Sequence, residues 1–188
     1  MDTQNVKKPI VINFTGAPGA GKSTGAAFVF SILKRKGYNC ELVTEFAKDK
    51  TWEHNDTALS CQEYVFGKQS YRLARCREDV DIIITDSPLP LGLIYVNNPA
   101  LDEHFEKTVM NIFNTYTNFN IFVERAKPYN PKGRNQTEEE ANALSHKIRD
   151  MYNRLNIPFY TIRGTDEDYI AIAEAFIEFY KKLTEETV

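Results

Sequence analysis

Hydrophobic residues along this chain gather in short runs that alternate with longer amphipathic stretches. The runs are rich in β-branched residues and predict strands over 9–15, 39–44, 81–86, 120–124 and 158–162. The third run places isoleucine on consecutive positions, as in a parallel strand that is covered on both faces. Because strands and helical stretches alternate, the pattern predicts an α/β fold with a doubly wound sheet.

The stretches between the strands predict helices over 22–36, 61–77, 101–116, 138–155 and 166–183. Ser60 with Glu63, and Thr137 with Glu140, have the spacing of a capping box, in which each side chain binds a backbone N–H of the helix start. A weaker version of the same signal lies at 165–168. These signals predict that helices begin just after residues 60, 137 and 165.

Length and charge narrow the classes of protein. With 188 residues, the chain predicts one domain over 1–188 that can bury its own core. The net charge of −3 and pI of about 5.7 give no basic field that would mark a nucleic-acid partner. The apolar runs are much shorter than the roughly 20 residues that span a bilayer, and the polar start is unlike a signal peptide. Cys40, Cys61 and Cys76 are scattered, as free thiols in a reducing cytosol are, so we expect a cytoplasmic protein with no membrane partner.

The segment after the first predicted strand carries the strongest motif. It is Gly16, Ala17, Pro18, Gly19, Ala20, Gly21, Lys22 and Ser23, followed by Thr24. The segment fits the phosphate-binding pattern G-x-x-x-x-G-K-[ST], in which glycines let successive backbone N–H groups point at phosphate oxygens. In this pattern Lys22 reaches the β- and γ-phosphates, and the hydroxyl of Ser23 binds Mg²⁺. The sequence therefore predicts nucleotide binding, helped by the dipole of the helix that starts here.

Asp86 ends the third predicted strand, at the position of a Walker-B acid that holds Mg²⁺ opposite Ser23. The alternative is an aspartate that only caps the turn before Pro88. The next residue is Ser87, not the glutamate with which motor-type ATPases polarise water, and the guanine motif N-K-x-D is missing. These features argue against a GTPase and against a mechanical ATPase.

Two further segments carry candidate catalytic groups. Glu45 follows the second predicted strand, whose carboxyl end faces the ligand crevice, so its carboxylate could accept a proton from an attacking hydroxyl. The alternative is a glutamate that only starts a helix. The irregular stretch 125–136 carries the cations Arg125, Lys127, Lys132 and Arg134. A mobile lid with such cations would meet the charge of a transferring phosphoryl group, and the alternative is a solvated turn.

The predicted helix over 61–77 has polar residues on a stripe that is otherwise apolar. Gln62, Gln69 and Arg72 interrupt this stripe, which also contains Phe66. Long polar groups on an inward face need partners, and a substrate pocket would supply them, because amides suit base edges and arginine suits a phosphate. Trp52 and other aromatic residues could stack on a base or belong to the core.

These residues together resemble the P-loop nucleoside and nucleotide kinases, above all the small nicotinamide riboside kinase-like and phage-encoded kinases. The resemblance covers nearly the whole chain and rests on the phosphate loop, on the segment Glu45-Phe46-Ala47-Lys48-Asp49 and on Asp86-Ser87-Pro88. It implies a three-layer P-loop fold, with a five-stranded parallel sheet in the order 2-3-1-4-5 and helices on both faces. It also implies that the γ-phosphoryl group of ATP, with Mg²⁺, passes to a small acceptor.

The resemblance and the residues lead to one set of assignments. The catalytic candidates are Lys22, Glu45, Asp86, Arg125 and Arg134. The phosphate loop with Thr24 would hold ATP, and the loop with Arg163 and Thr165 would border the adenine. The acceptor would bind to Asp49, Gln62, Phe66, Gln69 and Arg72.

The acceptor itself stays open, because the motifs Asp-Arg-Tyr and Glu-Arg-Ser of thymidylate and deoxynucleoside kinases are missing. Glu45 favours a hydroxyl of a nucleoside, of nicotinamide riboside or of a hydroxymethylated base, since a hydroxyl gains from a base and a phosphate does not. The alternatives are a nucleoside monophosphate kinase in which Arg72 holds the acceptor phosphate, and a regulatory module that binds nucleotide without transfer. DNA as acceptor is not favoured by the acidic pI, and a homodimer is left open.

Overall fold

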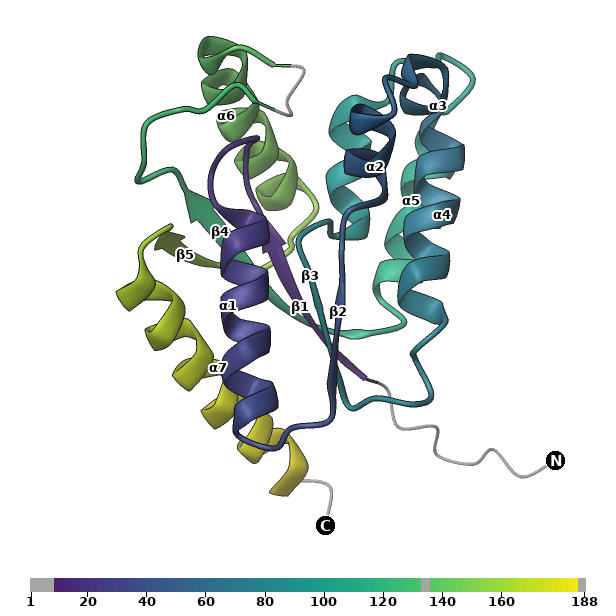
Figure 1. Ribbon diagram of the computed structural model, residues 1–188. Helices are drawn as coiled ribbons and strands as arrows, with labels where there is room; N and C mark the ends of the chain where they lie inside the picture. Colours follow the sequence, from purple (N-terminus) through teal and green to yellow (C-terminus); the bar gives the residue numbers. More distant parts are fainter. Residues whose placement is uncertain (1–8, 133–135, 186–188) are drawn as a thin grey trace, which may run out of the picture.

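A parallel sheet forms the middle layer of the molecule, in the strand order β2-β3-β1-β4-β5 (Figure 1). The strands are β1 (Ile10–Thr15), β2 (Cys40–Val43), β3 (Ile82–Thr85), β4 (Thr117–Glu124) and β5 (Tyr160–Arg163). The structure is a computed structural model that describes residues 9–132 and 136–185. It confirms the predicted fold class and the predicted strand order.

Two helices cover one face of the sheet, α1 (Lys22–Arg35) and α7 (Asp166–Glu185) (Figure 1). The side chains of β1 alternate, so Ile12 and Phe14 reach this face and pack in the same cluster as Phe176 of α7. Gly25 of α1 permits the close approach of α7, because a Cβ at this position would lie 2.4 Å from the ring of Tyr169. This packing fixes the helix that starts at the phosphate loop.

The other face is covered by α4 (Gln62–Ala74), α5 (Glu103–Phe113) and α6 (Glu138–Arg154), with the 3₁₀ helix η1 (Leu89–Tyr95) between them. Val11 of β1 packs on this face with Leu73 of α4 and Val109 of α5. The helices on both faces complete the predicted three layers. None of the helices within 9–132 and 136–185 is long and apolar enough to cross a membrane.

Strand β4 begins at residue 117, three positions before the predicted start at 120. The first part of β4 was missed because its polar residues interrupt the apolar run. Asn118 and Asn120 are nevertheless hydrogen-bonded within the sheet. The amide of Asn13 on β1 donates to Asn118 at 2.9 Å and to Asn120 at 3.0 Å. Buried polar groups with such partners fit inside a sheet.

Two short helices follow β2 and escaped prediction, α2 (Phe46–Trp52) and α3 (Asp56–Ser60). Each has two turns or fewer, which is too short for an apolar period to appear in the sequence. Figure 1 places α2, α3, the loop between β1 and α1, and the start of α6 at the same end of the molecule. This is the end at which the parallel strands terminate, where α/β folds bind ligands.

The predicted capping boxes had different outcomes. At α6 the box is confirmed, since Glu140 N–H donates to Thr137 Oγ1 at 3.2 Å and Thr137 N–H donates to Glu140 Oε2 at 2.7 Å. At α4 the prediction is wrong. Ser60 is the last residue of α3, its hydroxyl donates to the carbonyl of Thr57 at 2.9 Å, and the N-cap of α4 is Cys61 without a side-chain cap. The weaker signal is confirmed in part, because Asp168 N–H donates to Thr165 Oγ1 at 3.3 Å.

Candidate active site

The phosphate loop connects β1 directly to α1. Gly16, Gly19 and Gly21 have φ values of 139°, 80° and 107°, which L side chains rarely adopt, so the sequence needs glycine at these positions. The amine of Lys22 donates to the carbonyl of Ala17 at 3.1 Å, inside the loop. Helix α1 has Gly21 as its N-cap, and no side chain caps it. An anion at this place would therefore meet the positive end of the helix dipole.

Distant elements pack against the outside of the phosphate loop. The hydroxyl of Tyr169 on α7 donates to the carbonyl of Gly21 at 3.0 Å. A Cβ on Gly16 would lie 2.6 Å from the carbonyl oxygen of Val123 on β4, and one on Gly164 would lie 2.8 Å from the carbonyl oxygen of Ala20. The loop is thus held from β4, α7 and the segment after β5.

A cavity of about 550 Å³ opens beside the phosphate loop. Its walls come from α1, α2, α4, η1 and the stretch before α6. Polar and charged lining residues include Lys22, Ser23, Thr24, Glu45, Lys48, Gln62, Ser87, Lys132 and Gln136. Apolar and aromatic lining residues include Trp52, Leu59, Val65, Leu91 and Tyr95. One end of the cavity is therefore suited to phosphates and the other to a ring.

Glu45 sits at the N-cap of α2, but its side chain makes no capping hydrogen bond and lines the cavity instead. Burial of the carboxyl group raises the pKa of Glu45 above its ordinary value. The charge of Lys22 opposes this rise, and the charge of Asp86 adds to it. A carboxylate with a raised pKa, in the same cavity as the phosphate loop, has the properties of a general base.

Asp86 follows β3 and is only 3% exposed. Its Oδ1 accepts the backbone N–H of Glu45 at 2.9 Å, so the end of β3 and the start of α2 are tied together. Ser23 lines the cavity, and the two residues offer the hydroxyl and carboxylate oxygens that Mg²⁺ prefers. Within the described residues no group of three or more His, Cys, Asp and Glu side chains could hold a metal. A Mg²⁺ ion here would need oxygens from a bound nucleotide as well.

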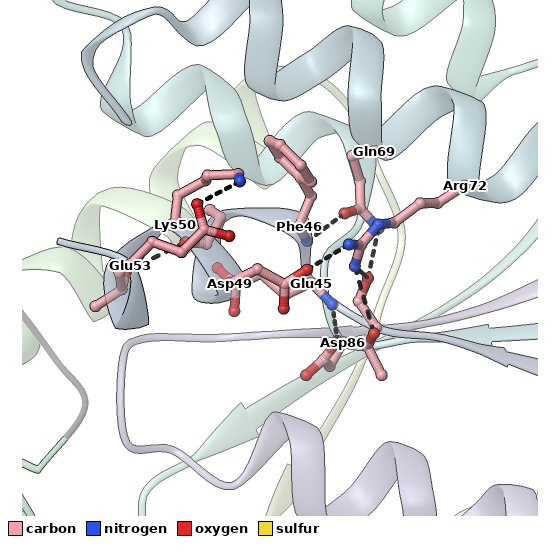
Figure 2. A network of polar contacts seen from close by, with 11 residues as sticks. Glu45, Phe46, Asp49, Lys50, Glu53, Gln69, Arg72 and Asp86 are labelled. Atoms are coloured by element: carbon pink, nitrogen blue, oxygen red, sulfur yellow. Dashed lines mark hydrogen bonds and ion pairs between the residues drawn. The ribbon is translucent and has the colours of Figure 1, made fainter. Parts of the chain in front are cut away.

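Gln69 and Arg72, which the sequence assigned to an acceptor pocket, are not among the residues that line this cavity. Figure 2 shows both side chains beside the backbone at Glu45 and Phe46. Gln69 Oε1 accepts the backbone N–H of Phe46 at 2.8 Å, and Arg72 donates to the carbonyl of Thr44 at 3.1 Å. Arg72 also forms an ion pair with Asp49, a residue that was expected to bind the acceptor. The partners of these polar side chains are thus parts of the chain and not a ligand.

Of the remaining residues that were predicted to bind the acceptor, one lies in the core and one lines the cavity. Phe66 packs edge-on against Phe105 of α5, with a distance of 5.6 Å between ring centroids, and belongs to the core. Gln62 lines the cavity as expected, and its amide donates to the carbonyl of Leu59 at 2.7 Å. Trp52 also lines the cavity and is 61% exposed, as a side chain available for stacking would be.

The basic stretch before α6 is irregular where it is described, as predicted. Arg125 donates to Glu138 at 3.0 Å and to Asn142 at 2.6 Å, so it is tied to the start of α6 and does not line the cavity. Lys132 does line the cavity. Arg134 lies outside the described residues. The cation that this stretch offers to the cavity within its described part is therefore Lys132.

The loop after β5 lies against the phosphate loop through Gly164. Arg163 is exposed at the end of β5, and the hydroxyl of Thr165 takes part in the start of α7. Neither residue lines the cavity beside Lys22. Their predicted place at the adenine stays a prediction.

Tyr95 is a candidate that sequence reasoning missed. It ends η1, lines the cavity, and burial together with the charge of Glu45 raises the pKa of Tyr95 to about 12. It therefore offers a protonated hydroxyl close to the candidate base. The seven-residue 3₁₀ helix is too short for a period that would have marked this residue in the sequence.

Residues 11–169 match a protein family described as "AAA domain". A curated protein of Sulfurisphaera tokodaii, named "Probable thymidylate kinase", is 29% identical over 113 residues, which are 56% of this chain and 58% of that protein. The chain thus matches a little over half the length of this relative. A solved structure, thymidylate kinase from Ehrlichia chaffeensis, has a TM-score of 0.59, covering 92% of this chain and 99% of that one. At 12% identity this likeness shows a shared fold.

Proposed function

Because the chain belongs to the AAA domain family of P-loop proteins, we propose that it transfers the γ-phosphoryl group of ATP to a hydroxyl of a nucleoside-like acceptor. The observation that carries this proposal is the place of Glu45, whose carboxylate lines the same cavity as Lys22 and Ser23. A base and a phosphate loop that share one cavity are what phosphoryl transfer to a hydroxyl requires. Residues 1–188 would act as one kinase domain.

Each residue would have a separate task. Lys22 and the backbone of the phosphate loop would hold the phosphates of ATP, and Ser23 with Asp86 would hold Mg²⁺. A bound Mg²⁺ ion would neutralise part of the negative charge of the phosphates. The carboxylate of Glu45 would take the proton of the acceptor hydroxyl as the hydroxyl oxygen bonds to the γ-phosphorus of ATP. The bond from that phosphorus to the β–γ bridging oxygen would break, and ADP would leave.

Transfer to an acceptor is better supported than hydrolysis of ATP. Ser87 follows Asp86, where motor-type ATPases have a glutamate, and its backbone N–H donates to Thr85 Oγ1 at 3.1 Å. This position therefore offers no carboxylate to activate water. The carboxylate that lines the cavity is that of Glu45, the N-cap of α2, a helix that also carries the ring of Trp52. That arrangement suits an acceptor with an aromatic base.

A hydroxyl acceptor is better supported than a phosphate acceptor. Arg72, the cation that would have held an acceptor phosphate, is paired with Asp49 and lies outside the cavity lining. The negative charge of Glu45 would also repel a phosphate placed beside it. A nucleoside or a similar riboside therefore fits the cavity better than a nucleotide.

Monophosphate kinase activity is the second candidate, and two observations favour it. The relative from Sulfurisphaera tokodaii carries the name of a thymidylate kinase. Lys48 lines the cavity three residues after Glu45 and offers a cation on the acceptor side. Lys132 of the basic stretch lines the same cavity and offers a further cation in either case.

The proposal is tested by ADP release from ATP and Mg²⁺ with nucleosides, nicotinamide riboside, nucleoside monophosphates and hydroxymethylated DNA as acceptors. We expect ADP to form at a rate that depends on a nucleoside-like acceptor, and the phosphorylated product to be found by mass spectrometry. Preference for monophosphates would replace the hydroxyl proposal by the second candidate. ADP release that ignores every acceptor would indicate hydrolysis, and tight ATP binding without ADP would favour a regulatory module.

A further inference from the structure

The backbone around Glu45 is held on both sides by side chains of other elements (Figure 2). Its own N–H donates to Asp86 Oδ1 at 2.9 Å, and the next N–H, that of Phe46, donates to Gln69 Oε1 at 2.8 Å. The amide of Gln69 also donates to the carbonyl of Thr44 at 3.5 Å. Two successive peptide groups at Glu45 are therefore fixed from the end of β3 and from α4.

Arg72, one turn after Gln69 on α4, holds the same segment at two further points. It donates to the carbonyl of Thr44 at 3.1 Å and forms an ion pair with Asp49 on α2. Its guanidinium also lies 5.2 Å from the centre of the Phe46 ring. The carbonyl before Glu45 and the helix after it are thus bound by one planar group, and a planar fork loses little freedom when it makes several contacts.

The burial of Gln69 makes its hydrogen bonds important for stability. Gln69 is only 4% exposed, so an amide without its partners would be costly at this position. An apolar side chain of similar size would fill the same space without binding the backbone. The choice of glutamine and arginine at these positions is therefore explained by the segment that they hold.

We propose that Gln69 and Arg72 are positioning residues, which fix the start of α2 so that the carboxylate of Glu45 faces the phosphate loop. The inference rests on the proposed function, in which Glu45 is the base. The two side chains touch no reacting atom and act through the backbone of 44–46. Movement of about 1 Å away from a reactive geometry can cost about a hundredfold in rate.

The split between kcat and KM offers a readout that a merely structural role would not give. Gln69 and Arg72 are not among the residues that line the cavity beside Lys22. A displaced Glu45 should therefore lower kcat while the KM for ATP stays near that of wild type.

The test compares four variants of the full chain. Gln69→Met removes the amide without a change in charge, so it tests the hydrogen bonds of Gln69 alone. Arg72→Met removes the guanidinium and keeps the stem, and Arg72→Lys keeps the charge but not the fork. Arg75→Met is the matched control, because Arg75 is an exposed arginine at the C-cap of the same helix.

We expect Gln69→Met and Arg72→Met to lower kcat by about tenfold to a hundredfold, with the KM for ATP within about twofold of wild type. Arg72→Lys should recover part of the loss, and Arg75→Met should match wild type. If kcat of both test variants stays with that of the Arg75→Met control, the inference is wrong.

Hydrogen exchange separates a failure of this inference from a failure of the proposed function. Amides of 44–50 should exchange faster in Gln69→Met and Arg72→Met than in wild type and Arg75→Met, whether or not an acceptor is known. Unchanged exchange in this segment would overturn the inference on its own. Wild-type protein that transfers phosphoryl groups to no acceptor would overturn the proposed function, and faster exchange in the variants would still support the structural half of the inference.

Discussion

The two ends of the cavity are built in different ways. At the phosphate end, one continuous segment of eight residues, 16–23, supplies the glycines, the lysine and the serine. At the acceptor end, Glu45, Gln62, Trp52 and Tyr95 come from α2, α4 and η1, and Glu45 is set in place by side chains from two other elements. The phosphate end is therefore a single sequence motif, and the acceptor end is assembled from residues that are distant in the sequence.

This difference determines what a substitution does at each end. The phosphate end depends on glycines whose backbone approaches other elements closely, so an added methyl group is harmful there. The acceptor end depends on polar contacts between distant residues, so the loss of one side chain moves another. A substitution at the phosphate end should therefore lower activity directly. A substitution at the acceptor end should lower activity either by removing a reacting group or by moving one out of position.

The largest effect is expected at the phosphate end. Lys22→Ala removes the cation that would meet the transferring phosphoryl group, and such cations are worth on the order of 10³–10⁵ in rate. Steady-state ADP release measures the loss, and circular dichroism checks that the fold is intact. Lys36→Ala, an exposed lysine at the C-cap of the same helix, is the control. Normal turnover of Lys22→Ala would refute the assignment of the loop.

At the acceptor end, Glu45→Gln keeps the shape of the side chain and removes the base. We expect kcat to fall by about 10²–10⁴, with little change in the KM of the acceptor. Because the pKa of Glu45 is raised, wild-type kcat should decline as pH falls through a value above that of an ordinary glutamate. The acid limb should vanish in the variant. Glu53→Gln, an exposed acid at the C-cap of α2, should behave as wild type, and an equal loss in both would contradict the assignment.

A pair of glycine substitutions compares the packing of α1, which starts at the phosphate end, with the packing of α4, which contributes to the acceptor end. Gly25→Ala puts a Cβ 2.4 Å from Tyr169 and 2.9 Å from Phe14, so unfolding in urea should require about 1–3 kcal/mol less. Gly67 on α4 has no atom within 4 Å of such a Cβ, so Gly67→Ala should instead stabilise by roughly 0.5–1 kcal/mol. Equal effects of the two substitutions would break the distinction between the ends.

The smallest effect concerns stability and pH. The pKa of Glu45 is raised in the folded protein, so the folded state binds its proton more tightly than the unfolded state does. Folding stability from this group is present at low pH and is lost as pH rises through the raised pKa. Glu45→Gln should therefore raise Tm at pH 7, and the difference should shrink toward pH 4. A lower Tm at pH 7 would show that the carboxylate is held favourably.

The strands of the sheet could be predicted from the sequence because they are apolar runs. Predicted strands 81–86 and 39–44 lie within one residue of β3 and β2 at each end. The strand order came from the resemblance and is confirmed. The phosphate loop was visible because all of its residues are neighbours in the sequence.

The acceptor end was harder to predict, because its contacts join distant residues. Gln69 and Phe46 are 23 positions apart, and Arg72 and Thr44 are 28 apart. A helical period shows that a side chain faces inward, but not whether it meets a ligand or another part of the chain. The same limit applies to Ser60, whose spacing to Glu63 suggested a cap although its hydroxyl was taken by the helix that ends there.

The hydrogen bond from Tyr169 to Gly21 spans 148 positions of the chain. During synthesis, residues 16–23 leave the ribosome before β4 exists, because β1 finds its neighbour β4 only after residue 124 has been made. The hydroxyl that closes the loop from outside arrives later still, with α7. The nascent chain thus carries the complete motif long before it has a complete site. Its ability to capture a nucleotide should therefore appear only after Tyr169 has been made.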